Sequence, residues 1–135
     1  MPGTYLIWLE SPQIASQAKP GQFIMVRCGE ENLLRRPLSI HQTDKDKIAL
    51  LFAVVGKGTQ WLSNCKKGDT LDLLGPLGNG YSIHPDSYNL LLVAGGIGIA
   101  PLRFLADVAV EQGKRVTLLS GASTTIQLYP QHFLP

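Results

Sequence analysis

Residues 89–101 read Asn-Leu-Leu-Leu-Val-Ala-Gly-Gly-Ile-Gly-Ile-Ala-Pro. The almost continuous apolar run from Asn89 to Ala94 is typical of a parallel strand that is buried on both faces. Three glycines form the loop that follows, and the final proline suits the first turn of a helix, where its missing N–H has no helical partner. Since a helix N-terminus attracts anions, this order favours a phosphate-binding turn. The alternative is a tight turn that binds nothing.

The residues after this stretch continue the pattern. The spacing of one apolar helix face is present at Leu102, Leu105, Ala106 and Ala109. Gly113 ends this helix, and Arg115–Ser120 is a second apolar strand. A strand, a helix and a strand are the start of an α/β doubly wound sheet. Because the sheet stops there, we expect an unpaired apolar edge that a partner chain, a homo-oligomer or disorder relieves.

The residues before the stretch predict a different architecture. Short strands alternate with turns, at residues 5–9, 22–26, 36–41, 48–55 and 70–74. Thr59 is placed to cap a short helix that runs to about Asn64. Strands of this length and spacing favour an antiparallel β barrel or sandwich. A polar segment at 84–88 separates the two patterns, so we expect one domain at residues 1–86 and a partial α/β domain at 87–135.

Composition narrows the classes of function. The 135 residues are 44% hydrophobic and 16% charged, and the charged share lies below the roughly 25% of ordinary soluble domains. This balance excludes a disordered chain, and 14 glycines and 9 prolines exclude a coiled coil. The net charge of +2 is thinly spread, which gives no reason to expect nucleic acid or a membrane as a partner.

Cysteines, histidines and the N-terminal sequence indicate little chemistry. Cys28 and Cys65 have no metal-type spacing, so we expect buried or half-buried thiols and no metal site. His41, His84 and His132 are isolated, and we expect them on the surface or in loops. No catalytic acid, base or nucleophile is evident.

The longest apolar run is far shorter than the ~20 residues that span a bilayer. The N-terminus lacks a signal-peptide pattern, so we expect a cytoplasmic protein.

Two further segments contain the residue types that bind phosphates. Arg35–Ile40, Arg-Arg-Pro-Leu-Ser-Ile, offers an arginine that can grip a phosphate and a serine that can bond to a planar ring. Gly56–Thr59 places two glycines and a hydroxyl at a helix start. Taken alone, the first is equally a strand with two solvated arginines, and the second a capped turn. The glycine-rich loop at 75–81 is, taken alone, only a turn.

In this order, the segments resemble the ferredoxin–NADP reductase superfamily of flavoproteins. Four sequence words are most similar to the electron transfer subunits of class B dihydroorotate dehydrogenase: Arg-Arg-Pro-Leu-Ser-Ile, Val-Val-Gly-Lys-Gly-Thr, Gly-Pro-Leu-Gly-Asn-Gly and Gly-Gly-Ile-Gly-Ile-Ala-Pro-Leu. The resemblance runs from about Gly21 to Gln131. It implies a Greek-key, FAD-binding β barrel followed by the start of an NAD-binding domain. It also implies an oxidoreductase component of pyrimidine biosynthesis, which passes electrons between NAD(H), flavin, an iron–sulfur centre and a catalytic dihydroorotate dehydrogenase subunit.

The resemblance also assigns roles to individual positions. The residues implied to bind FAD are Arg36, Pro37, Leu38, Ser39, Leu51, Phe52, Ala53, Gly58 and Thr59. The residues implied to bind the nicotinamide nucleotide are Gly95, Gly96, Gly98 and Pro101. Arg36 would lie toward the phosphates, and Ser39 beside the reactive edge of the ring. A tyrosine often stacks on the flavin where Leu38 stands, so aliphatic packing would replace stacking here.

This sequence departs from the family in two ways. The family's cysteine cluster, which ligates a two-iron, two-sulfur centre, has no counterpart, since Cys28 and Cys65 lie elsewhere. The nucleotide-binding part also stops early, so we expect it to hold NADH poorly and to need its missing part and a partner subunit for turnover. Three alternatives stay open: a flavin-binding module without turnover, a ferredoxin reductase-like NAD(P)H oxidoreductase, and a barrel without flavin.

Overall fold

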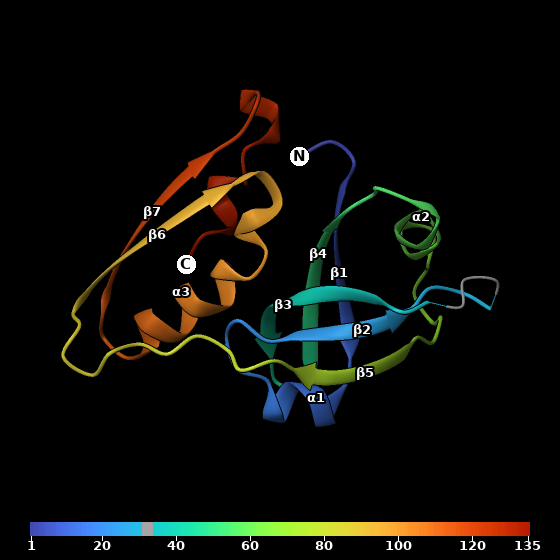
Figure 1. Ribbon diagram of the computed structural model, residues 1–135, viewed down its shortest axis with the longest axis horizontal. Coiled ribbons are helices and arrows are strands. Elements are labelled where there is room, and N and C mark those ends of the chain that lie inside the picture. The colour runs from blue at the N-terminus through green and yellow to red at the C-terminus, as the bar shows by residue number, and fades with distance from the viewer. Residues whose placement is uncertain (31–33) are drawn as a thin grey trace.

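A computed structural model describes residues 1–30 and 34–135. Its larger sheet is antiparallel, with the strand order β1-β4-β3-β2-β5 (Figure 1). The strands are β1 (Thr4–Glu10), β2 (Phe23–Arg27), β3 (Arg36–Asp44), β4 (Lys47–Ala53) and β5 (Asp72–Leu77). Two short helices, α1 (Pro12–Gln17) and α2 (Lys57–Ser63), lie at opposite ends of this sheet.

β4 is the most completely buried strand of the antiparallel sheet because its sequence is the most apolar. All five residues from Ile48 to Phe52 are buried, and the strand pairs with β1 on one side and β3 on the other. The register between β3 and β4 shifts between Ile40 and Gln42. The successive residues Ile40 and His41 are both buried. Ile40 packs in the core of the sheet, and His41 contacts the glycine loop on the other side.

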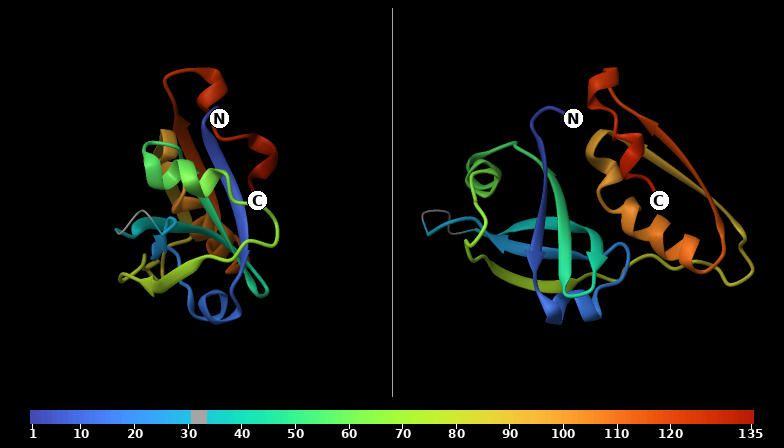
Figure 2. Two further views of the ribbon diagram at one scale, coloured as in Figure 1. Left: turned by 90° about the vertical axis from the view of Figure 1, so that its right-hand side faces the viewer. Right: turned by 180° about the vertical axis from the view of Figure 1, so that it is seen from behind.

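The rest of the described chain forms two parallel strands and a helix. β6 (Asn89–Gly95) pairs in parallel with β7 (Arg115–Gly121). Between them come a 3-10 turn at Gly96–Ile99 and the helix α3 (Leu102–Glu111). Two further 3-10 turns, Thr125–Gln127 and Gln131–Phe133, bring the C-terminal tail back toward α3 (Figure 2). This order confirms the predicted start of a doubly wound sheet.

α3 belongs to two hydrophobic cores. Leu105 and Ala106 pack with Leu92 beneath β6 and β7, whereas Phe104 packs with the buried residues of the antiparallel sheet. The predicted apolar face is therefore correct, and Ala109 on it is also buried. The periodicity did not show that Phe104 is buried as well, because its partners belong to strands far away in the sequence.

Four features differ from the sequence-based expectations. β5 ends at Leu77, so the predicted loop at 75–81 begins inside a strand. The predicted barrel is an open sheet, since β1 and β5 are its outer strands and do not pair with each other. One face of β6 is solvent-exposed rather than buried: Leu91 and Val93 are 62% and 67% exposed. The helix α1 was not predicted, although Ser11 followed by Pro12 is a recognised helix start.

Candidate functional site

A cavity of about 570 Å³ lies where the antiparallel sheet meets the glycine loop, and we call it the sheet–loop cavity. Such a volume is typical of small-molecule sites. It is lined by every residue that the sequence analysis assigned to FAD: Arg36, Pro37, Leu38, Ser39, Leu51, Phe52, Ala53, Gly58 and Thr59. Its other lining residues are Val55, Gly56, Ile97, Gly98, Ala100 and Pro101. Three sequence segments that looked separate therefore meet around one space.

The two adjacent arginines before and in β3 have different positions. Arg35 donates hydrogen bonds to the Oδ1 of Asp72 at 2.9 Å and to the Asp72 carbonyl oxygen at 3.1 Å, so its guanidinium is engaged outside the cavity. Arg36 is exposed and lines the cavity. The arginine doublet thus consists of one structural cation and one cavity-facing cation.

Gly58 leaves room for the Arg36 side chain at the start of α2. A Cβ built on Gly58 would lie 3.2 Å from Arg36 Cγ and 3.3 Å from Arg36 Nε, which is closer than nine in ten real Cβ contacts. Gly58 and Thr59 lie in the first turn of α2, where N–H groups have no acceptor within the helix. A cation and these N–H groups therefore share one side of the cavity, which suits an anionic group.

The Thr59 hydroxyl is used inside the turn that precedes α2. It accepts hydrogen bonds from the N–H of Val55 at 2.9 Å and from the N–H of Gly56 at 3.1 Å, and it donates to the Gly56 carbonyl at 3.2 Å. These bonds confirm Thr59 as a capping residue, which acts from the third helical position rather than from the N-cap itself. What Thr59 can offer a ligand is its main chain.

β4 supplies an apolar wall through two residues that pack on opposite sides of the strand. Leu51 packs with Ala100 and Tyr129 on the side of the glycine loop. Phe52 packs in the core of the antiparallel sheet and stacks on Tyr5, with ring centroids 6.0 Å apart. Because Phe52 is only 2% exposed, its ring supports the wall and leaves little surface for a ligand.

The predicted nucleotide-binding residues are divided between two cavities. Gly98 and Pro101 line the sheet–loop cavity. Gly95 and Gly96 line a second cavity, of about 690 Å³, which we call the strand-end cavity because it lies at the carboxyl ends of β6 and β7. It is completed by Gly121, Ala122, Ser123, Thr124, Ile126 and Gln127. The residues after β7 were not among the predicted nucleotide-binding residues, although their place beyond a second parallel strand was a usable signal.

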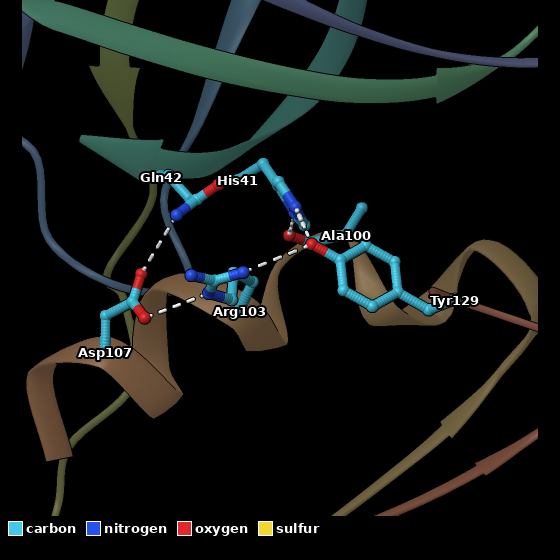
Figure 3. Close-up of polar contacts among 6 residues, drawn as sticks. All are labelled: His41, Gln42, Ala100, Arg103, Asp107 and Tyr129. Carbon is cyan, nitrogen blue, oxygen red and sulfur yellow. Dashed lines mark hydrogen bonds and ion pairs between the residues drawn. The ribbon is translucent and has the colours of Figure 1, made fainter. Parts of the chain in front are cut away.

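His41 corrects the expectation of a surface or loop histidine, because it is fully buried beside the glycine loop. Its Nδ1 lies 2.7 Å from the carbonyl oxygen of Ala100, and its Nε2 lies 2.9 Å from the Tyr129 hydroxyl (Figure 3). A carbonyl can only accept, so Nδ1 carries the proton, and Nε2 of the neutral ring accepts from Tyr129. The sequence held no signal of this, because the two partners lie 59 and 88 residues away.

Arg103, Asp107 and Gln42 extend this network (Figure 3). Arg103 donates to the Tyr129 hydroxyl at 3.4 Å and to Asp107 Oδ1 at 2.9 Å, and Gln42 donates to Asp107 Oδ2 at 3.4 Å. Burial lowers the pKa of His41; the backbone hydrogen bond and Asp107 oppose this shift, and Arg103 adds to it. Burial raises the pKa of Tyr129, and Arg103 opposes that shift. At neutral pH the ring is therefore neutral and the hydroxyl protonated, as their hydrogen bond requires.

Both cysteines are thiols, the first buried and the second half-buried, as predicted. Burial raises the pKa of Cys28 and of Cys65, which makes both poor nucleophiles. Within residues 1–30 and 34–135, no group of three His, Cys, Asp or Glu side chains is placed to hold a metal ion. In the same described part of the chain, no helix is long and apolar enough to cross a membrane.

An antiparallel sheet with a cavity beside its third strand, followed by a parallel strand–helix–strand unit, is the fold of ferredoxin reductase-like flavoproteins. More narrowly, the chain belongs to the oxidoreductase FAD-binding domain family, which it matches over residues 4–81.

Two curated relatives and one solved structure are similar over nearly the whole chain. The electron transfer subunit of dihydroorotate dehydrogenase B (NAD(+)) from Desulforamulus reducens is 48% identical over 125 residues, which cover 90% of this chain and 48% of that protein. The subunit of the same name from Shouchella clausii is 39% identical over 137 residues, which cover 96% and 53%. A structure of the NADH-dependent reduced ferredoxin-NADP oxidoreductase matches with a TM-score of 0.87 and 37% identity, covering 97% of this chain and 48% of that one.

These similarities confirm the resemblance that the four sequence words indicated. The chain spans about half the length of the curated relatives it matches.

Proposed function

We propose that this chain binds FAD in the sheet–loop cavity and forms the flavin-carrying part of an electron transfer subunit of class B dihydroorotate dehydrogenase. The observation that carries the proposal is the convergence on one cavity of every residue assigned to FAD, from three short segments within residues 36–59. The family match over residues 4–81 and the similarity to subunits of that name support it.

The chemistry of the cavity residues fits FAD. Arg36 and the main-chain N–H groups of Gly58 and Thr59 would hold the pyrophosphate, because a cation and a helix start attract phosphate oxygens. Ser39 would bond to the edge of the ring. Leu38 is half-buried and packs against the core of the sheet, so it offers an aliphatic surface to the ring rather than an aromatic stack.

When bound, FAD would supply the redox chemistry, since flavins exchange both hydride and single electrons. The chain's own residues bind and orient the ring and exclude water from one side of it, through the apolar wall of β4 and the glycine loop. This role needs no acid, base or nucleophile from the chain.

The strand-end cavity is our proposed site for a nicotinamide nucleotide. Gly95 and Gly96 let a phosphate approach the main chain closely, and the carboxyl ends of parallel strands are where α/β domains bind nucleotides. NAD(H) would then exchange electrons with the flavin, and a catalytic dihydroorotate dehydrogenase subunit would be the partner in pyrimidine biosynthesis. A cytoplasmic location and the division into residues 1–86 and 87–135 belong to the same proposal.

An iron–sulfur centre does not fit the residues of this chain. A two-iron, two-sulfur centre needs four cysteine or histidine ligands. The chain has two cysteines and three histidines, and within the described residues 1–30 and 34–135 no three such side chains are grouped as ligands. We therefore assign no electron transfer step through such a centre to these residues.

Titration with FAD, followed by the quenching of flavin fluorescence, tests the proposal with a matched pair of variants. Arg36→Gln is expected to weaken FAD binding by about 10- to 100-fold, the range for loss of a charge-assisted hydrogen bond. Arg35→Gln should bind FAD as the wild type does, because Arg35 is engaged by Asp72. No FAD uptake by folded wild-type protein would refute the proposed function. Equal losses in both variants would refute the role of Arg36.

A further inference from the structure

We propose that His41 is a positioning residue that holds the glycine loop as one wall of the FAD site, through the hydrogen bond from its Nδ1 to the carbonyl of Ala100. The inference rests on the proposed function of the sheet–loop cavity. It assigns a role to a residue that does not line that cavity itself.

His41 joins two walls of the same cavity. It lies on β3, two residues after Ser39, which lines the cavity from the sheet side. Its acceptor, Ala100, lies between the loop residue Gly98 and Pro101, and all three line the cavity from the loop side. The 2.7 Å bond between them is therefore a direct tie across the corner where sheet and loop meet.

The other ring nitrogen fixes the direction of this tie. Arg103 donates to the Tyr129 hydroxyl, and that hydroxyl donates to Nε2, so the proton of the neutral ring must lie on Nδ1. Every hydrogen bond of the series then runs toward the Ala100 carbonyl. Only one orientation of the His41 ring then gives both of its nitrogens a hydrogen-bond partner. A side chain that holds a loop in place needs such a fixed orientation.

Packing acts together with this bond but does not replace it. Leu51, Ile99, Ala100 and Tyr129 form a hydrophobic cluster on the loop side of β4. Apolar contacts of this kind have no direction, and they allow the loop to slide, whereas a donor aimed at one carbonyl does not. The hydrogen bond from His41 therefore sets the position of the loop along the sheet. The hydrophobic cluster attaches the loop to the sheet.

Two substitutions separate the roles of the two ring nitrogens. In His41→Asn the side-chain NH₂ occupies the place of Nδ1, so the bond to Ala100 can be kept. In His41→Gln the side-chain amide reaches the place of Nε2, so Tyr129 keeps a partner and Ala100 loses its donor. Gln also fills more of the space of the ring than Asn does, so a role in packing alone would favour Gln.

The measurements are the FAD dissociation constant and, without FAD, the amide hydrogen exchange of residues 97–100. We expect His41→Asn to stay within about 3-fold of the wild type in both. We expect His41→Gln to weaken FAD binding and to speed loop exchange by about 5- to 10-fold, as for one lost hydrogen bond. Equal behaviour of the two variants, or better retention by Gln, would overturn the proposal.

Two further outcomes are also decisive. If neither variant folds, the tautomer of His41 in the wild type decides: nitrogen NMR should show the proton on Nδ1, and a proton on Nε2 at neutral pH would overturn the proposal. If the wild type takes up no FAD, the proposed function fails, and the exchange measurement still tests whether His41 holds the loop.

Discussion

Acidification from pH 7.5 to 5.5 is expected to destabilise the protein through one buried imidazole. His41 is fully buried, and its pKa in the folded chain lies below the ordinary value of 6.5, chiefly because of burial. The unfolded chain takes up a proton at this residue as the pH falls through 6.5, whereas the folded ring, whose pKa is lower, takes up its proton only at lower pH. The unfolded state then binds more protons, so stability that is present above pH 6.5 is lost as the pH falls toward the folded pKa.

The size of this effect follows from a single proton. One proton contributes at most ~1.4 kcal/mol per pH unit, so the upper limit of the loss at pH 5.5, from an unfolded pKa of 6.5, is about 1.4 kcal/mol. Arg103 increases the effect, because its guanidinium and a charged His41 ring would repel each other across the Tyr129 hydroxyl that both contact. Asp107 reduces it.

Urea unfolding, followed by the fluorescence of Trp8 and Trp61, measures this loss at several pH values. The free energy of unfolding of His41→Asn should change much less between pH 7.5 and 5.5 than that of the wild type. His84→Gln is the matched control and should keep the full loss, because His84 lies in the exposed loop before β6. A wild-type stability that does not fall over this range, or an equal fall in His41→Asn, would refute the reasoning.

Three further predictions test other parts of the structure. Gly58→Ala should weaken FAD binding, measured by fluorescence titration, because the new Cβ displaces Arg36; the unfolding midpoint should stay the same or rise, since alanine favours a helix. A fall in stability with unchanged FAD affinity would contradict this. Phe104→Ala should lower the free energy of unfolding by about 3–5 kcal/mol, whereas Val110→Ala on the exposed side of the same helix should change it far less. Similar losses in both, in chemical denaturation, would disprove the double packing of α3. Leu91→Thr should change stability by no more than about 0.5 kcal/mol, and a loss above 2 kcal/mol would show that this face is covered in solution.

Much of the fold was predictable because its signals are local. The apolar run of β4, the apolar face of α3 and the glycine loop each occupy one short segment, and each formed as predicted. Features that depend on distant segments were not predictable. Whether β1 and β5 pair depends on the coiling of the whole sheet, and the exposure of Leu91 depends on which layers cover it.

In the candidate site, too, the local features were predictable and those that depend on distant segments were not. Three of the four sequence words contribute residues to the lining of the sheet–loop cavity, and the resemblance added Leu51, Phe52 and Ala53. The fourth word, at residues 75–80, does not line this cavity. The resemblance selected Arg36 over Arg35, and the cavity lining agrees. The residue types alone could not separate the two arginines, since the partner that engages Arg35 is Asp72, 37 residues away. They also could not identify His41 as part of the site, because its burial depends on the loop and the C-terminal tail folding against β3.

The double packing of α3 has a consequence for how the chain unfolds and evolves. Phe104 fills the antiparallel core from a helix that the other core also holds, so the two parts should melt in one cooperative transition rather than two. A fragment that ends at residue 86 would lack the Phe104 ring, and it would expose apolar surface that favours aggregation. The antiparallel sheet therefore cannot simply be joined to a different nucleotide-binding domain. Such a recombinant is expected to fold well only if the new domain supplies a residue that fills the place of Phe104.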